Sequence, residues 1–178
     1  HYSRQETLVS DIVDALGAAG HDVDALDPTA LSGADEFHLG GRLATLAVLD
    51  AVRAESPTRV LDVGCGIGGA TRTIATELDT QVVGVDLTPP FVAAASELTQ
   101  RVGLGDDVTF EVGDALDLAH PDTVFDLVTL LHVGMNVADK PGLFAELARV
   151  LRPGGRLLVY DIMRIAPGEL TLPVPWTS

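Results

Sequence analysis

The sequence predicts a doubly wound α/β domain, in which helices cover both faces of a mainly parallel sheet. From residue 59 onward, short apolar segments alternate with longer segments whose apolar residues recur at helical spacing. Strands that alternate with helices pair in parallel through right-handed crossovers. The first apolar segment also runs directly into a glycine-rich turn that opens a helix, and glycine lets a ligand approach the backbone closely.

The expected elements follow from this alternation. Strands are predicted at residues 59–63, 81–85, 108–112, 124–131 and 156–162. Helices are predicted at residues 69–78, 89–102 and 141–151, and an Arg-Pro-Gly-Gly turn at residues 152–155 leads into the last strand. Before the sheet, helices at residues 4–19 and 41–54 flank a polar loop at residues 22–35. The chain thus divides into an N-terminal helical cap, residues 1–56, and a sheet-bearing core, residues 57–178, within one structural domain.

Composition limits the function classes. The chain of 178 residues has 11 basic and 26 acidic residues, and its formal charge of −15 repels nucleic acid and anionic membranes. The longest apolar stretch, residues 124–135, is too short and too interrupted to span a bilayer. No secretory leader opens the chain and a single cysteine fits a reducing compartment, so we expect a cytoplasmic protein. The five histidines show no metal-ligand spacing, so no metal site is predicted, and nothing in the sequence indicates an oligomeric state.

The glycine-rich turn is compatible with more than one ligand. Gly64, Gly66 and Gly69 match the G-x-G-x-x-G dinucleotide fingerprint, whereas Gly64, Gly66 and Gly68 match G-x-G-x-G. The helix N-terminus after the turn presents free amides to a negative or polar group. On its own, the turn leaves a methyltransferase, a dehydrogenase and a purely structural turn as alternatives.

Three carboxylates at the ends of the first three strands narrow these alternatives. Asp62 lies two residues before the first glycine, where it can hold the loop or meet an ammonium group but would sit badly beside a pyrophosphate. Asp86 ends the second strand, where a carboxylate accepts hydrogen bonds from both ribose hydroxyls in either cofactor class. Asp114 follows the third strand and can accept from an adenine amino group.

In combination these motifs resemble the class I methyltransferases of the Rossmann-like type, over residues 59–162. The matching segments are residues 62–68 (Asp-Val-Gly-Cys-Gly-Ile-Gly), 85–87, 113–115, 125–128 and 151–155 (Leu-Arg-Pro-Gly-Gly). Dehydrogenases do not usually carry that last pentapeptide after an amphipathic helix. The family sheet has seven strands and five are counted here, so we expect the C-terminal strands to be missing from this sequence.

The resemblance implies S-adenosylmethionine as the cofactor. Its implied binding residues in the sheet-bearing core are Asp62, Gly64, Gly66, Gly68, Asp86, Leu87, Asp114, Ala115 and Leu131. The glycines would contact the methionine part, Asp86 the ribose, and the residues that follow the second and third strands the adenine. His132, just past the fourth strand, is the candidate catalytic residue because the pKa of histidine can lie near neutrality. A core role for Leu87 and a structural role for His132 are the alternatives.

The segment at residues 35–41, Asp-Glu-Phe-His-Leu-Gly-Gly, resembles the Phe-His-x-Gly-Gly stretch of small-molecule methyltransferases, including the sarcosine and dimethylglycine N-methyltransferase group. Residues 1–4 and 173–176 resemble that group too. Its N-terminal helices cover the cofactor, which implies that Phe37, His38 and Gly40 lie near the methionine moiety. The alternative is a glycine turn beside a surface histidine.

The resulting hypothesis is methyl transfer from S-adenosylmethionine to a small-molecule acceptor, an amine or a natural-product hydroxyl. The acidic surface and the resemblance to amino-acid N-methyltransferases favour the amine. Such a transfer is an in-line displacement with a good leaving group, so it needs alignment, and a base only if the acceptor arrives protonated. The alternatives are an NAD-dependent oxidoreductase and a non-catalytic nucleoside-binding domain.

Overall fold

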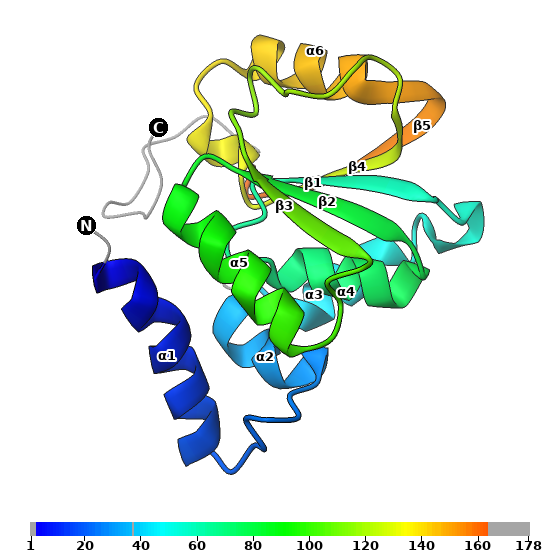
Figure 1. Ribbon diagram of the computed structural model, residues 1–178. Helices are drawn as coiled ribbons and strands as arrows, with labels where there is room; N and C mark the ends of the chain where they lie inside the picture. Colours follow the sequence, from blue (N-terminus) through cyan, green and yellow to red (C-terminus); the bar gives the residue numbers. More distant parts are fainter. Residues whose placement is uncertain (1–2, 37, 164–178) are drawn as a thin grey trace.

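The computed structural model describes residues 3–36 and 38–163, and these form a five-stranded sheet between layers of helices (Figure 1). The strands are β1 (Arg59–Val63), β2 (Gln81–Asp86), β3 (Val108–Val112), β4 (Phe125–Leu131) and β5 (Leu151–Tyr160). All neighbouring strands pair in parallel, in the order β3-β2-β1-β4-β5. The prediction of a doubly wound α/β fold is therefore confirmed.

Helices cover both faces of this sheet. One face carries α4 (Gly69–Leu78) and α5 (Pro89–Arg101), and the other carries α6 (Lys140–Val150) (Figure 1). The N-terminal helices α1 (Ser3–Ala18), α2 (Pro28–Asp35) and α3 (Gly41–Leu49) lie on the side of α4 and α5, with α1 against α5 and both α2 and α3 against α4. Short 3-10 helices, η1 (Arg53–Glu55) and η2 (Gly134–Asn136), precede β1 and follow β4. No helix in the described ranges is long and apolar enough to cross a membrane.

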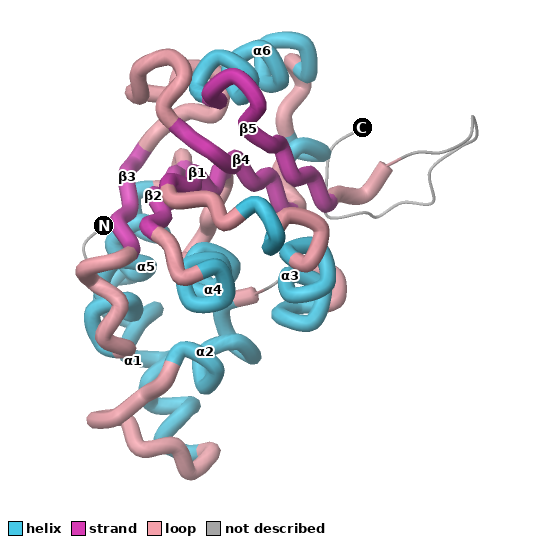
Figure 2. Tube along the Cα trace, turned by 90° about the vertical axis from the view of Figure 1, so that its right-hand side faces the viewer, coloured by secondary structure: helices cyan, strands magenta, loops and turns pink. Residues whose placement is uncertain are grey.

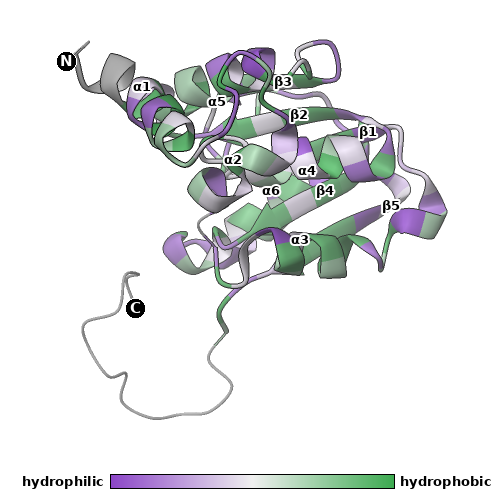
Figure 3. Ribbon diagram, turned by 90° about the horizontal axis from the view of Figure 1, so that it is seen from below, coloured by the Kyte–Doolittle hydropathy of each residue, from purple (hydrophilic) through white to green (hydrophobic). Residues whose placement is uncertain are grey.

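The apolar sequences of the central strands reflect burial on both faces. All seven residues of β4 are buried, as expected for a central strand of a parallel sheet covered by helices on each side. Side chains that pack on the α6 face include Leu61, Val128 and Leu143. Side chains on the opposite face include Val60 and Ile74. Figure 3 shows the resulting apolar strands in green between helices of mixed hydropathy.

The N-terminal cap differs from the predicted arrangement. The expectation of a polar loop at residues 22–35 was wrong over its second half, which forms α2. Asp27 caps this helix, because its Oδ1 accepts the backbone N–H groups of Thr29 at 2.7 Å and Ala30 at 3.2 Å, and Pro28 occupies the first turn. An aspartate N-cap followed by proline is itself a helix-start signal. The next helix, α3, ends at residue 49 and not at 54.

The last strand begins earlier than predicted. Leu151 already pairs with Phe125, and the next register pair joins Arg156 to Leu127. Residues 152–155 therefore stand opposite Asp126 alone and have no register partner on β4, although Arg152 forms an ion pair with Asp126 at 2.8 Å. The Pro-Gly-Gly sequence accounts for this excursion, since Gly154 has a φ of +82°. Figure 2 shows β4 and β5 side by side beyond it, with α6 above them.

The strand order places a topological switch point at the centre of the sheet. The chain passes from β1 outward to β2 and β3, and then returns across the sheet to β4 and outward to β5. The connections after β1 and after β4 therefore diverge to opposite faces. In such sheets, ligands bind in the crevice outside the carboxyl ends of the strands at this point.

Candidate functional site

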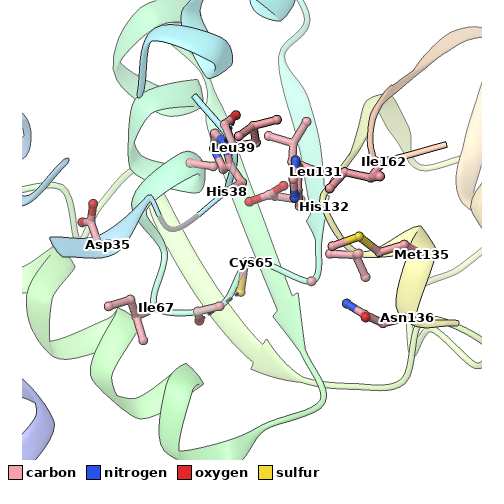
Figure 4. Close-up of a pocket in the computed structure, with 15 residues that line it drawn as sticks. Asp35, His38, Leu39, Cys65, Ile67, Leu131, His132, Met135, Asn136 and Ile162 are labelled. Carbon is pink, nitrogen blue, oxygen red and sulfur yellow. Dashed lines mark hydrogen bonds between the residues drawn. The ribbon is translucent and has the colours of Figure 1, made fainter. Parts of the chain in front are cut away.

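A pocket of about 540 Å³ lies at this switch point, formed by the segments that follow β1 and β4 and by the end of α2. Its lining residues are Asp35, His38, Leu39, Asp62, Gly64, Cys65, Gly66, Ile67, Ala70, Leu131, His132, Val133, Met135, Asn136 and Ile162. The volume is in the range of small-molecule sites, roughly 300–1,000 Å³. Figure 4 shows Asp35 and Ile67 at one end of the pocket, Met135 and Asn136 at the other, and Cys65 between them.

The glycine-rich turn forms the floor of the pocket through a left-handed backbone. Gly64, Gly66 and Gly68 have φ values of +76°, +56° and +85°. A Cβ atom at Gly64 would lie 2.1 Å from Cγ2 of Val133, whereas one at Gly66 would meet no atom within 4 Å. Position 64 therefore requires glycine for packing, and position 66 presents bare backbone to open space in the pocket.

Asp62 is a buried carboxylate at the centre of the site. It is 2% exposed, and it links β1 to its neighbours because Thr71 of α4 donates to Oδ2 and Thr129 of β4 donates to Oδ1, each at 2.7 Å. Burial raises the pKa of this carboxyl, and the two threonine hydrogen bonds partly oppose that effect. Asp62 thus both holds the strand ends together and faces the pocket.

Asp86, at the end of β2, fixes the shape of the turn. Its Oδ2 accepts the backbone N–H of Gly66 at 2.9 Å, and its Oδ1 accepts the N–H of Thr88 at 2.8 Å. The side chain does not line the pocket in this structure, although each oxygen keeps a lone pair for a further donor.

A buried ion pair attaches the end of α2 to α4. Nη2 of Arg72 lies 2.6 Å from Oδ2 of Asp35, and both side chains are almost completely buried. The same guanidinium donates to the carbonyl of Ile67 at 2.9 Å and to Oγ1 of Thr99 at 2.8 Å. Burial raises the pKa of Asp35 to about 6, and the neighbouring guanidinium limits the rise.

Glu36 holds the imidazole of His38 at the pocket wall. Nε2 of His38 lies 3.4 Å from Oε2 of Glu36 and 3.0 Å from Oγ1 of Thr45. Because Thr45 donates its own hydroxyl proton to Glu36, at 2.5 Å, its oxygen accepts from Nε2–H of the histidine. The hydrogen bond to Glu36 raises the pKa of His38.

His132 faces His38 across the same wall. The ring centroids are 5.7 Å apart, and Tyr160 at the end of β5 lies 5.4 Å from His132. The backbone of His132 has a φ of +59°, an uncommon conformation for a residue with a side chain. Burial, followed by the proximity of His38, lowers the pKa of His132, so this imidazole is neutral near pH 7.

The residues predicted from sequence separate into two groups. Those that line the pocket are His38, Asp62, Gly64, Gly66, Leu131 and His132. Those that do not are Gly40, Gly68, Asp86, Leu87, Asp114 and Ala115. The core alternative for Leu87 was wrong, because its side chain is 69% exposed beside the pocket-forming turn. Phe37 lies outside the described residues.

Several lining residues were not predicted. They are Asp35, Leu39, Cys65, Ile67, Ala70, Val133, Met135, Asn136 and Ile162. Cys65 and Ile67 stand between the glycines and were within reach of sequence reasoning. Asp35 opens the segment that carries His38, but nothing in the sequence connected it to Arg72, which lies 37 positions away in the chain.

The charges around the pocket select the chemistry of its ligand. Two buried carboxylates, Asp35 and Asp62, face it, and its described lining includes no lysine or arginine. A pyrophosphate there would be brought against both carboxylates, and the one nearby guanidinium, that of Arg72, is already paired with Asp35 and does not line the pocket. A ligand with positively charged groups, such as a sulfonium and an ammonium, fits this donor and acceptor set better than a dinucleotide does.

Comparison with known proteins shows that this chain is similar to methyltransferases. The chain is 42% identical over 117 residues to the probable chloroplastic tocopherol O-methyltransferase of Oryza sativa subsp. japonica, which covers 66% of this chain and 32% of the rice protein. It is similar to the solved structure of Haemonchus contortus phosphoethanolamine N-methyltransferase 2 in complex with S-adenosyl-L-methionine, with a TM-score of 0.65, 33% identity, and coverage of 71% of this chain and 29% of that one.

A third protein is similar in fold alone. A putative sarcosine dimethylglycine methyltransferase from Galdieria sulphuraria gives a TM-score of 0.64 at 24% identity, over 67% of this chain and 46% of that one. The chain thus spans less than half the length of each of these three proteins.

Residues 61–159, from β1 to β5, match the family described as Methyltransferase domain, over more than half of the chain. The match contains the glycine-rich turn, Asp86, His132 and the central strands that form the pocket. The chain therefore belongs to the Methyltransferase domain family, as the resemblance of its motifs to class I methyltransferases predicted.

Proposed function

We propose that this chain binds S-adenosylmethionine in the pocket and transfers its methyl group to a small-molecule acceptor, an amine in preference to a hydroxyl. The observation that carries the proposal is the pairing of a left-handed glycine turn with two buried carboxylates at the switch point of the sheet. A bare backbone and a negative wall suit a ligand that is both bulky and cationic. The rice and nematode relatives, by their names, methylate a hydroxyl and an amine respectively.

The cofactor, when bound, supplies an electrophilic methyl group on a sulfonium. The residues of this chain would hold it and align the acceptor. Gly64 and Gly66 would contact the methionine part through their backbones, and Asp62 would offset positive charge. Asp86 would bind the ribose hydroxyls with the lone pairs that its two amide hydrogen bonds leave free. The adenine would lie along an outer rim formed by Leu87, Asp114 and Ala115, next to the glycine turn.

The opposite end of the pocket would receive the acceptor. Leu39, Leu131, Met135 and Ile162 give this end an apolar wall, against which a small acceptor would pack. His132 lies beside them with a lowered pKa, so its neutral ring can accept the proton of an acceptor that arrives as an ammonium or a hydroxyl. Alignment supplies most of the acceleration and this proton transfer the remainder.

The surface charge bears on the partners. A formal charge of −15 disfavours nucleic acid and anionic membranes and attracts small cationic amines. We place the protein in the cytoplasm, with a freely diffusing metabolite as its acceptor; the single cysteine supports a reducing compartment.

The test is a turnover assay with a panel of amines and hydroxyl compounds, in which S-adenosylhomocysteine and methylated product are both measured by mass spectrometry. Product from glycine derivatives or other small amines would support the amine acceptor, and the variant H132N should lower kcat by about 100-fold or more where the acceptor arrives protonated. Turnover on hydroxyl acceptors alone would contradict the preference for amines. Hydride transfer with NAD would contradict the whole proposal.

A further inference from the structure

The end of α2 brings an incompletely paired carboxylate into the pocket wall. The side chain of Asp35 is 2% exposed, and its Oδ2 accepts from Nη2 of Arg72 at 2.6 Å. Within the part of the chain that the structure describes, Oδ1 of Asp35 meets no hydrogen-bond donor and Nε of Arg72 meets no acceptor. The pair therefore uses one contact where a two-pronged arrangement would use both oxygens. A buried oxygen without a donor is unfavourable, and a ligand that donates to it would relieve that cost.

The place of this carboxylate determines which charge it favours in a ligand. A Cβ atom at Gly69 would lie 2.7 Å from Oδ1 of Asp35, so the carboxylate rests against the first turn of α4. The free amides of a helix N-terminus normally attract an anion, but an anion placed there would lie against the carboxylate of Asp35. Asp62, the other pocket carboxylate, accepts from a threonine at each oxygen. A cationic donor therefore gains more binding free energy from a hydrogen bond to the unpaired oxygen of Asp35 than from one to Asp62, whose oxygens already accept hydrogen bonds.

We propose, on the basis of the function proposed above, that Oδ1 of Asp35 receives the α-ammonium group of the cofactor's methionine moiety. Asp35 lies with Ile67 at the end of the pocket away from Met135 and Asn136, so the acceptor end stays free (Figure 4). Through this contact α2, which precedes the family match, would take a direct part in selecting the cofactor. An ammonium group has three donors and suits the acceptor that this site leaves open, because Arg72 occupies only Oδ2 of Asp35.

The test compares two ligands on two forms of the chain by calorimetric titration. The ligands are S-adenosylhomocysteine and its analogue without the α-amino group, and the forms are the wild type and D35N. The substitution should weaken binding of S-adenosylhomocysteine by about 10- to 100-fold, the range of a charge-assisted hydrogen bond, and change binding of the analogue by less than about threefold. The variant D27A is the matched control, because it removes the N-cap of the same helix without touching the pocket charge, and it should leave the preference for the amino group unchanged.

A measurement on the wild type covers the case in which D35N does not fold. The carboxyl carbon of Asp35 reports its own pKa by NMR, so the contributions of its neighbours Arg72 and Glu36, and of His38 and Asp62 across the pocket, are not confused with it. S-adenosylhomocysteine should lower the pKa of Asp35 from about 6 to about 5 or below, and the analogue without the amino group should not lower it.

Each other outcome contradicts the assignment. Equal weakening of both ligands in D35N, or an unchanged pKa in the wild type, would show that Asp35 only anchors α2. Unchanged affinity for both ligands would show that the ammonium group binds elsewhere. Failure of the wild type to bind either ligand would contradict S-adenosylmethionine as the cofactor, and with it the proposed function. The failure of the proposed function is thereby distinguished from a failure of the Asp35 assignment alone.

Discussion

Alanine at position 64 would place its Cβ atom 2.1 Å from Cγ2 of Val133, on a backbone whose φ is +76°. Overpacking of this kind costs about 1–3 kcal/mol, and a side chain on a left-handed backbone costs about 1–2 kcal/mol. Alanine restricts the unfolded chain, which offsets about 0.4–1 kcal/mol of these costs, so G64A should lower the free energy of unfolding by about 1–4.5 kcal/mol. That is a large fraction of the roughly 5–15 kcal/mol typical of a folded domain.

Gly66 provides the matched control two residues away. Its φ of +56° carries the same backbone cost, but a Cβ atom there meets nothing within 4 Å. Because alanine also lowers the conformational entropy of the unfolded chain, about 0.4–1 kcal/mol of this backbone cost is offset. The free energy of unfolding of G66A should therefore fall by only about 1 kcal/mol. Because position 66 lines the pocket, the added methyl group should instead weaken binding of S-adenosylhomocysteine by about tenfold or more.

Urea unfolding followed by circular dichroism measures both stabilities, and calorimetry of G66A measures the binding. The reasoning predicts a gap of about 1–3 kcal/mol between the two variants, with G64A the less stable. If the two variants unfold at the same urea concentration, or if G66A binds as tightly as the wild type, the assignment of one glycine to packing and the other to the ligand is wrong.

Three further substitutions probe separate parts of the account. D86A removes the acceptor of the Gly66 and Thr88 amides, so it should weaken binding of S-adenosylhomocysteine at least tenfold in calorimetry; an unchanged affinity would exclude Asp86 from the site. D126A removes the acceptor of the Thr58 and Arg59 amides at the amino end of β4, and should cost about 1–3 kcal/mol in urea unfolding without altering that affinity. E36Q should lower the pKa of His38, measured by NMR titration. The folded-state pKa of His38 is raised above 6.5, so protonated His38 stabilises the fold fully below that pH, and this stabilisation is lost as pH rises through the folded-state pKa. E36Q should make this loss of stability with pH smaller. An unchanged His38 titration would contradict the Glu36 contact.

The sheet was predictable because its strands are defined by burial. β1 and β4 are buried at almost every position since helices cover both faces, and most of their residues are apolar, which is the pattern that the sequence displays. Their bounds agree with the predicted ones within one residue. α2 was missed because Pro and Gly around residues 28 and 33 were interpreted as loop signals, although Asp27 and Pro28 act here as a cap and a first turn.

The site was predictable only where one short segment forms it. Gly64, Gly66 and Asp62 belong to a continuous turn, so their presence in the pocket follows from local pattern. The pairing of Asp35 with Arg72 and the approach of His38 to His132 depend on how the N-terminal cap packs on the core. Such contacts between distant segments leave no periodic signal in a single sequence. The roles assigned to Leu87, Asp114 and Ala115 stay predictions.

The central claim is that the pocket takes S-adenosylmethionine and not a dinucleotide. Calorimetric titration of the chain with S-adenosylhomocysteine, with NAD as a parallel ligand, tests it most directly. We predict saturable binding of S-adenosylhomocysteine with one site per chain, and no measurable heat with NAD. Binding of NAD in its place would contradict the account, because a pyrophosphate would then be accommodated beside two buried carboxylates.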